Sequence, residues 1–328
     1  MAALPRALEA SPPLLPTSLG EYARWIVSGI GASEGPARLL VGLLLEQGLS
    51  ARFQPVTAFL GPDAPAGDVL VVVSQRLSPN ARVPLARRGS YRAVVLLTTL
   101  DPASDERCAE IARGGGTIIR HGPPDEDGLL LRVLGPALAT QAALRLASAI
   151  ASARGALPSW AARLDEVGAA AELARARAAP LAPERMFGPT AIVTAGDDGA
   201  LATGLSTKLL EALGVSPPIW DLCGLVHGPL QSFFEAERLL FVLEPQGDRT
   251  AGLLRRRLER IVDPARHRIH VLDAVLPHPL AYFEYASALD ALILAALKAR
   301  PRDLANWPGK GRDGPLYELD GPPGPDTA

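Results

Sequence analysis

Positions 208–230 read KLLEALGVSPPIWDLCGLVHGPL and include Lys208, Glu211 and His227, whose side chains are able to transfer protons. Lys208 and Glu211 are three positions apart, so they share one face if this segment is helical. His227 follows Glu211 by 16 positions (227 − 211), beyond a glycine and a pair of prolines. A carboxylate and an imidazole on neighbouring elements can act together: one moves a proton between adjacent carbons and the other helps to open a sugar ring. An aldose–ketose isomerase needs residue types of this kind.

Each of these residues also has an ordinary structural interpretation. The commonest position of a Glu is a solvated surface, where Lys208 would simply be the ion-pair partner of Glu211, worth about 0.2–0.5 kcal/mol. A lone loop histidine is most often solvated or structural. We favour the catalytic interpretation because the histidine loop follows the Lys/Glu helix and because perturbed acid–base groups gather in clefts. The remaining histidines are expected to be structural or solvated: His121, His267, His270 and His278. Cys223 is expected to be a small buried residue.

The 208–230 segment resembles the sugar isomerase (SIS) family, and in particular the isomerase half of glucosamine-6-phosphate synthase. That family carries L-K-x-x-E, followed sixteen positions after the Glu by the His of an H-G-P-L loop. The resemblance implies that Glu211 is the enolisation base, that Lys208 supports it, and that His227 opens the sugar ring. It extends over about residues 20–306 as two SIS halves, without the glutaminase domain of the synthase.

Two loops in the first half resemble the family's anion-binding loops. Residues 29–33 (GIGAS) are similar to its first Gly/Ser loop, and residues 70–75 (LVVVSQ) to the strand that ends in its S-Q-S-G phosphate loop. The resemblance implies that an anionic group of the substrate is held by Ser33, Ser74, Gln75, Arg76 and Ser78. The alternative is that 29–33 is an ordinary tight turn between a strand and a helix. Arg76 is explained equally well as a surface cation or as a bidentate anion ligand.

The sequence departs from the family in two of the segments that hold the substrate in that family. Arg76, Leu77 and Ser78 stand where the family usually has Ser-Gly and then Ser or Thr. Residues 301–306 (PRDLAN) resemble the family's P-R-N-L-A-K, so Asn306 occupies the place of the Lys that holds the sugar carbonyl. Lys310 is near enough in sequence to replace that Lys. Residues 307–312 (WPGKGR) are interpreted either as an active-site lid or as a tail packed on a partner subunit.

Apolar runs alternate with helical patterns along the chain, which predicts parallel α/β units. We expect an α/β fold of two SIS-type three-layer α/β/α halves, each around a five-stranded parallel sheet. The first SIS domain is predicted at 1–155, the second at 156–300 and a C-terminal tail at 301–328. Strands are predicted at 25–28, 69–73, 92–97, 117–120, 190–194, 238–243 and 268–272, and helices at 34–47, 136–154, 158–178, 199–213, 250–262 and 282–298.

The amino-acid composition argues against several classes of function. The 33 basic and 35 acidic residues nearly balance, so nothing indicates a nucleic-acid surface. Two cysteines form no disulfide framework and fit a reducing cytosol, so a cytoplasmic location is expected. The long apolar stretch 129–150 is interrupted by charges and does not predict a membrane span. No metal or organic cofactor is implied. A homodimer is implied by the resemblance, with apolar Ala/Leu helix faces available for an interface.

The sequence is compatible with three hypotheses about function. The first is an enzyme that isomerises a phosphorylated or otherwise anionic sugar, or that adds or removes an amine as a deaminase or deglycase does. The second is a non-catalytic SIS protein that senses a sugar phosphate and regulates a partner. The altered loop at Arg76 and the replacement at Asn306 favour it, whereas Lys208, Glu211 and His227 together disfavour it. The third is an isomerase whose substrate is not phosphorylated.

Overall fold

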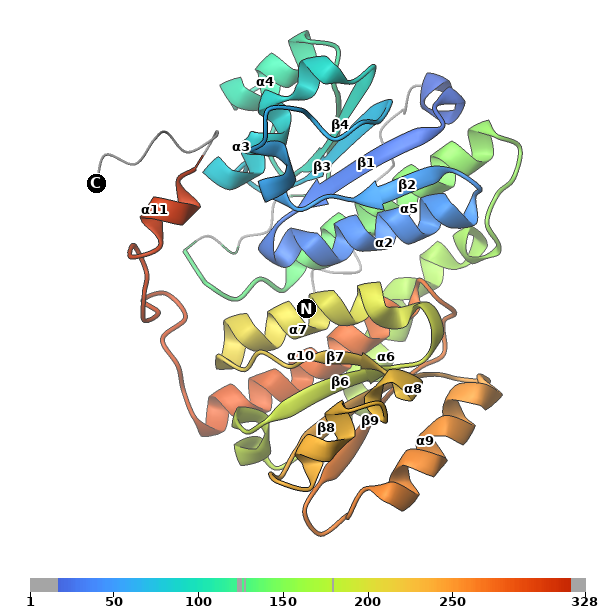
Figure 1. The fold of residues 1–328 in the computed structure, drawn as a ribbon, viewed down its shortest axis with the longest axis vertical. Helices are drawn as coiled ribbons and strands as arrows, with labels where there is room; N and C mark the ends of the chain where they lie inside the picture. The colour runs from blue at the N-terminus through green and yellow to red at the C-terminus, as the bar shows by residue number, and fades with distance from the viewer. Residues whose placement is uncertain (1–16, 123–125, 127, 179, 320–328) are drawn as a thin grey trace. The chain divides into compact units, whose positions relative to one another are not determined.

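The computed structural model describes residues 17–122, 126, 128–178 and 180–319, and it divides into two compact units. The first-half unit contains the described residues up to 126 together with 134–161 and 306–319. The second-half unit contains residues 128–133 and 162–305. Each unit is built around its own parallel sheet (Figure 1), as the alternating pattern predicted.

Five parallel strands form the sheet of the first-half unit, in the order β2-β1-β3-β4-β5. The central strand, β3, is buried on both faces, which explains its unbroken apolar sequence VLVVV. The edge strand β2 is short and half exposed. The strands are β1 (Arg24–Gly29), β2 (Ser50–Phe53), β3 (Val69–Val73), β4 (Ala93–Thr98) and β5 (Thr117–Arg120).

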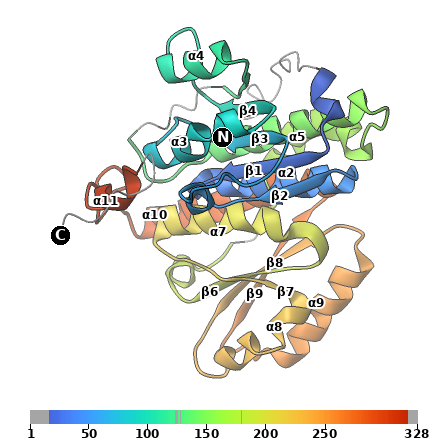
Figure 2. The ribbon, with the colours of Figure 1, turned by 45° about the horizontal axis from the view of Figure 1, so that its top comes forward.

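Helices cover both faces of this sheet (Figures 1 and 2). Two of them, α2 (Glu34–Glu46) and α5 (Leu134–Ala153), pack against each other on one face. The opposite face carries α3 (Pro79–Ala86) and α4 (Glu106–Arg113). The unit also contains α11 (Gly314–Tyr317) and short 3₁₀ turns at Thr17–Glu21, Gly31–Ser33, Val56–Phe59 and Arg88–Ser90.

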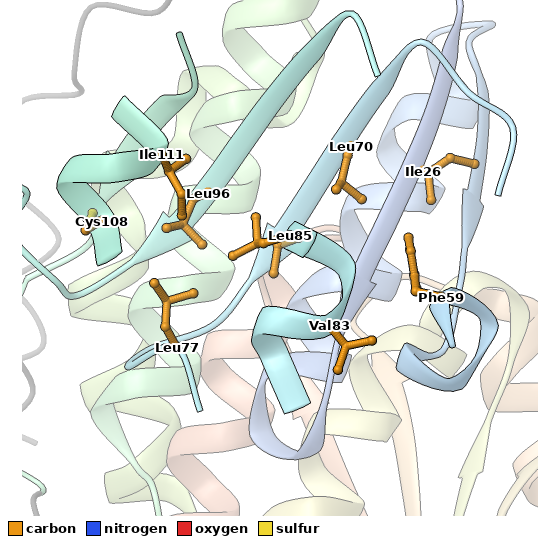
Figure 3. Close-up of a cluster of buried hydrophobic side chains, with 10 residues drawn as sticks. Ile26, Phe59, Leu70, Leu77, Val83, Leu85, Leu96, Cys108 and Ile111 are labelled. Atoms are coloured by element: carbon orange, nitrogen blue, oxygen red, sulfur yellow. The ribbon is translucent and has the colours of Figure 1, made fainter. Parts of the chain in front are cut away.

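The core beneath α3 and α4 joins residues from distant parts of the chain (Figure 3). Leu70 and Leu96 project from neighbouring strands, and Val83 and Ile111 meet them from the two helices. Each such side chain contributes about 1.5–3 kcal/mol when fully buried. This packing fixes β3 and the loop that follows it.

The second-half unit has four parallel strands in the order β7-β6-β8-β9. They are β6 (Thr190–Thr194), β7 (Ile219–Asp221), β8 (Leu239–Pro245) and β9 (Arg268–Ala274). One face carries α6 (Val167–Arg177), α7 (Gly199–Leu213) and α10 (Ala281–Ala299), and the other carries α8 (Leu222–Leu225) and α9 (Arg249–Ile261) (Figures 1 and 2). Further 3₁₀ turns lie at Ser159–Glu166, Pro183–Phe187, Gly196–Asp198 and Pro229–Phe233.

Two sequence predictions differ from this arrangement. The predicted fifth strand of the second half is wrong, because the described part of that sheet has four strands. The segment between β9 and α10 carries Pro277 and Pro279, which have no N–H to donate to a sheet. The helix predicted at 158–178 is in two parts, a 3₁₀ segment at Ser159–Glu166 and then α6. The predicted domain boundaries stay predictions.

Candidate active site

Lys208 and Glu211 lie on α7, as predicted. The helix forms because Leu201, Leu205 and Leu209 recur at a four-residue interval and are all buried. It ends at Gly214, whose backbone is left-handed (φ 72°) and whose N–H bonds the carbonyl of Leu210. The two charged residues are therefore fixed in the last two turns of a well-packed helix.

Lys208 is almost fully buried and pairs with an acidic residue that the sequence pattern did not indicate. Its Nζ lies 2.7 Å from Asp290 Oδ1, and the two side chains are 3% and 11% exposed. Asp290 belongs to α10, which packs against α7. A buried ammonium is strongly destabilising unless it is paired, so Asp290 allows Lys208 to sit one turn before Glu211.

Glu211 is half-buried and is held by a backbone amide. The N–H of Arg132 donates to Glu211 Oε2 at 3.0 Å. Arg132 lies in the segment Gly128–Val133, which belongs to the second-half unit although it precedes α5 in the chain. The same segment is attached to the C-terminal region by a bond of 2.8 Å from Leu130 N–H to Leu304 O. This loop orients the carboxylate of Glu211.

The C-terminal segment that resembles the family's P-R-N-L-A-K follows α10 and contacts the end of α7. A Cβ added to Gly214 would lie 2.7 Å from Nη1 of Arg302, so the guanidinium rests directly on this glycine. A cation is favourable there because the carbonyls at a helix C-terminus carry partial negative charge. Arg302 thus fixes the chain just ahead of Asn306.

His227 follows α8, on the other face of the second sheet. Its backbone N–H donates to Gly224 O at 3.1 Å, and its side chain is exposed. None of the contacts described for this residue links it to Lys208 or Glu211. Val226, the preceding residue, and Phe234, seven positions later, are large apolar side chains that are exposed. Cys223, expected to be buried, is exposed because it lies at the start of α8, where Asp221 caps the helix.

The loops that carry Ser33 and Ser74 are neighbours. β1 and β3 pair in parallel, with Gly29 opposite Val73, so the segments after them leave the same edge of the sheet. Both serines are buried. Ligands of open α/β sheets bind at this edge, where the chain crosses to opposite sides of the first strand.

Hydrogen bonds hold the loop after β3 in a fixed shape. Ser74 Oγ accepts the N–H of Leu77 at 3.1 Å, and Leu77 has a left-handed backbone (φ 49°). The carbonyl of Gln75 accepts the hydroxyls of Thr98 and Thr99 at 2.9 and 2.7 Å. The loop is therefore anchored to the end of β4 rather than mobile in solvent.

The start of α5 approaches the side chain of Gln75 closely. A Cβ added to Gly135 would lie 2.1 Å from Gln75 Nε2, so only glycine leaves room for this side chain. The buried carboxylate of Glu126 accepts the N–H groups of Leu134 and Gly135 at 2.6 and 3.0 Å. The first-half loops thus lie near a negative charge that the sequence pattern did not indicate.

The other predicted ligands lie at the surface. Arg76 is exposed, and Ser78 is the N-cap residue of α3 without a side-chain capping bond. Asn306 and Lys310 are exposed, and Lys310 Nζ lies 5.0 Å from the centroid of the Trp307 ring. That cation–π contact is consistent with either the lid or the tail interpretation of residues 307–312.

Two general features of the described residues bear on function. No group of three or more His, Cys, Asp and Glu side chains among them is placed to hold a metal ion. Among the helices the structure describes, none combines the length and apolar character that crossing a membrane requires.

The fold is that of solved enzymes that handle sugar phosphates. No protein-family model matches this sequence, and no curated protein is similar to it at the sequence level. The C-terminal domain of glucosamine-fructose-6-phosphate aminotransferase from Francisella tularensis superposes with a TM-score of 0.72 at 12% identity, covering 92% of this chain and 96% of that one.

Two further solved structures are similar over most of their length. Glucosamine-6-phosphate deaminase from Thermotoga maritima has a TM-score of 0.65 at 14% identity, covering 92% of each chain. Tagatose-6-phosphate ketose/aldose isomerase from Escherichia coli has a TM-score of 0.63 at 16% identity, covering 94% of this chain and 89% of that one. At these identities the similarity establishes the SIS-type fold alone.

Proposed function

We propose that this protein is an isomerase of a sugar phosphate, or a deaminase or deglycase of an amino-sugar phosphate, with Glu211 as the base. The observation that carries the proposal is the arrangement on α7. Lys208 is buried against Asp290, and Glu211, one turn later, is held by the Arg132 N–H. A surface Glu with a solvated Lys partner, the ordinary alternative, has no need of either fixed contact.

The chemistry needs no external oxidant or reductant. Glu211 takes a proton from the carbon next to the sugar carbonyl, and the electron pair of that C–H bond forms a carbon–carbon double bond as the carbonyl oxygen is protonated. The resulting enediol accepts the same proton back at the neighbouring carbon, while its other hydroxyl loses a proton and becomes the new carbonyl. For an amino sugar the intermediate is an enolamine, its protonation gives an imine, and water hydrolyses the imine to a carbonyl and the free amine. His227 assists by moving protons between the ring oxygen and the C1 hydroxyl when the ring opens.

The anion of the substrate is assigned to the loops after β1 and β3. Ser33, Ser74 and Gln75 supply hydroxyl and amide groups at the carboxyl edge, and Arg76 and Ser78 follow on the same loop. Asn306 and Lys310 would act from the C-terminal segment, with Lys310 taking the role of the family's Lys.

The chain is further proposed to be a double-SIS protein that forms a homodimer, with domains at 1–155 and 156–300 and a tail at 301–328. The exposure of His227 and of two apolar residues near it in sequence, Val226 and Phe234, supports a contact with a second copy of the chain. Large apolar side chains exposed together commonly mark such interfaces. In the dimer, His227 would reach the site of the partner copy.

A non-catalytic sensor is the second candidate, and two observations favour it. His227 has no described side-chain contact with Lys208 or Glu211, and Asn306 replaces the family's Lys. A sensor would bind a sugar phosphate and leave it unchanged.

Calorimetric titration with fructose 6-phosphate, tagatose 6-phosphate and glucosamine 6-phosphate tests the binding part of the proposal. Ser74→Ala and Arg76→Ala are each compared with Arg113→Ala, a variant of an exposed arginine on α4. A lost charged contact costs on the order of 1.5–3 kcal/mol, which corresponds to roughly 10- to 150-fold in affinity. If neither Ser74→Ala nor Arg76→Ala weakens binding, the first-half loops are not the anion site.

A further inference from the structure

The turns after β1 and β6 have the same backbone conformation but end in different side chains. Each is a 3₁₀ turn that begins with a left-handed glycine, Gly31 (φ 58°) or Gly196 (φ 66°). Each ends at the residue before a long helix, with φ −89° and ψ −9° at Ser33 and φ −73° and ψ 0° at Asp198. The second-half unit therefore repeats this turn of the first-half unit, with a carboxylate in place of a hydroxyl.

The position of this turn in the second sheet is one where α/β proteins bind ligands. β6 pairs with β7 on one side and with β8 on the other, so the chain crosses to opposite sides of β6. Side chains at the carboxyl ends of such strands face the crevice between the two crossovers. Asp198 follows β6 directly at this edge.

The carboxylate of Asp198 is buried with one oxygen unused. Its Oδ1 lies 3.1 Å from Nδ1 of His278, whereas its Oδ2 is buried and has no hydrogen-bond partner among the residues the structure describes. The side chain of Asp198 is only 3% exposed. A buried carboxylate oxygen that accepts no hydrogen bond is unfavourable, so a ligand group that donates one to it would be stabilised there.

A second unsatisfied group comes from α10. The side chain of Tyr285 is fully buried, and its Oη likewise has no partner in the described part of the chain. Burial and the negative charge of Asp198 raise the pKa of this phenol, so it remains an O–H donor. The neighbouring carboxylate of Glu284 does not bond this hydroxyl and instead accepts the backbone N–H groups of Val275 and Leu276.

We propose that the carboxyl edge of the second sheet is a second ligand site, which binds a hydroxyl group of a neutral polyol or sugar between Asp198 and Tyr285. A hydroxyl donates one hydrogen bond and accepts others, so a single group can donate to Asp198 Oδ2 and accept from Tyr285 Oη. A phosphate or carboxylate carries negative charge, which the carboxylate of Asp198 would repel. The second crevice therefore selects against the anions proposed for the first.

The turn leaves an approach to this position. No atom lies within 4 Å of a Cβ added to Gly196 or to Gly199, so the space beside both glycines is open. The His278 side chain, which contacts Asp198 Oδ1, is 25% exposed and forms the other border. A polyol with adjacent hydroxyls can thus enter past His278 and reach Asp198.

The test is calorimetric titration of the full chain with D-glucitol, a neutral polyol, and separately with inorganic phosphate. Tyr285→Phe and Asp198→Asn remove the donor and the charged acceptor with little change of shape. Ser33→Ala, at the matching position of the first half, is the control. We expect saturable D-glucitol binding that weakens at least tenfold in both second-half variants and is unchanged in Ser33→Ala. Phosphate should not compete with it.

Thermal unfolding without ligand gives an independent readout. If Tyr285 Oη has no partner in the unliganded protein, Tyr285→Phe should leave Tm unchanged or raise it, since no hydrogen bond is lost. D-glucitol should then raise the Tm of the wild type but not of Tyr285→Phe.

Three results would overturn the proposal. They are the absence of saturable D-glucitol binding, equal binding by wild type and Tyr285→Phe, and a crystal structure grown with D-glucitol in which only an ordered water joins Asp198 to Tyr285. Because this site involves none of the residues assigned to sugar-phosphate turnover, the outcome is independent of the proposed function.

Discussion

The ammonium of Lys208 lies 2.7 Å from Asp290 Oδ1, and this buried pair joins α7 to α10 within one helical turn of Glu211. The two residues are 82 positions apart in sequence (290 − 208). Lys208 therefore has a fixed structural partner in addition to any role beside the substrate. Loss of the pair is expected to affect stability and activity together, and the two effects have to be measured separately.

Lys208→Met should destabilise the protein strongly, because it leaves the charge of Asp290 in a largely buried place. Removing one partner of a buried ion pair typically costs about 3–5 kcal/mol. The measurement is the free energy of unfolding in urea. Arg163→Ala is the control, since Arg163 pairs with Glu166 at the surface and such pairs contribute about 0–1 kcal/mol. Equal losses in the two variants would show that the Lys208–Asp290 pair is not buried in solution.

Arg132→Pro should reduce turnover more than Arg132→Ala does. Proline removes the N–H that donates to Glu211 Oε2, whereas alanine keeps it. Misplacement of a catalytic group by about 1 Å can reduce the rate on the order of 10²-fold. We expect the loss in kcat with KM nearly unchanged, in protein whose circular dichroism matches that of the wild type. Identical kinetics in the two variants would rule out a positioning role for this amide.

Gly135→Ala should weaken sugar-phosphate binding by displacing Gln75. The added Cβ would lie 2.1 Å from Gln75 Nε2, so this flexible side chain has to move. The loss should be roughly tenfold if Gln75 holds the anion directly. The control is Gly42→Ala in α2, where the new Cβ meets no atom within 4 Å and stability should rise by about 0.5–1 kcal/mol. Normal binding by Gly135→Ala would remove Gln75 from the site.

His121 should make the folded state less stable in acid. Burial lowers the pKa of its imidazole from 6.5 to about 4, so the unfolded chain binds the proton more readily. The contribution of neutral His121 to the free energy of unfolding is fully present above pH 6.5. It is lost as the pH falls from 6.5 towards 4. A shift of this size corresponds to about 3 kcal/mol.

His121→Leu is the variant that tests this pH dependence. Neither ring nitrogen of His121 has a hydrogen-bond partner among the described residues, so the apolar replacement should cost little at pH 7. Urea unfolding at pH 7 and pH 4.5 should show a smaller loss of stability in acid for the variant. A loss equal to that of the wild type would show that His121 does not titrate in this way.

Much of the fold was predictable from the sequence because its central strands are continuous apolar runs. β3 (VLVVV) is buried on both faces, and β6 (TAIVT) is likewise fully buried. The elements that the sequence did not reveal are short or polar. β2 (SARF) is a half-exposed edge strand, β7 has three residues, and α4 (ERCAEIAR) has an apolar face of only two buried residues.

The candidate site was predictable only where neighbours in sequence form it. The spacing of Lys208 and Glu211 within one helix is local, and so is the pair Ser74 and Gln75 at the end of a strand. The partners that fix Lys208 and Glu211 are Asp290 and Arg132, and they come from tertiary packing across about 80 positions in each case. No local pattern of residue types specifies such a contact, because it depends on how α10 and the 128–133 loop pack against α7.

Exchange of hydrogen with solvent tests most directly whether Glu211 is the base of an isomerase. Wild type and Glu211→Gln are incubated in D₂O with fructose 6-phosphate, tagatose 6-phosphate and glucosamine 6-phosphate, and deuterium at C1 and C2 is followed by NMR. The account predicts that the wild type exchanges hydrogen at one of these carbons, and that Glu211→Gln binds the same sugar with exchange slowed about 10²- to 10⁴-fold. Exchange at equal rates in the two proteins, or no exchange by a wild type that binds the sugar, would contradict it.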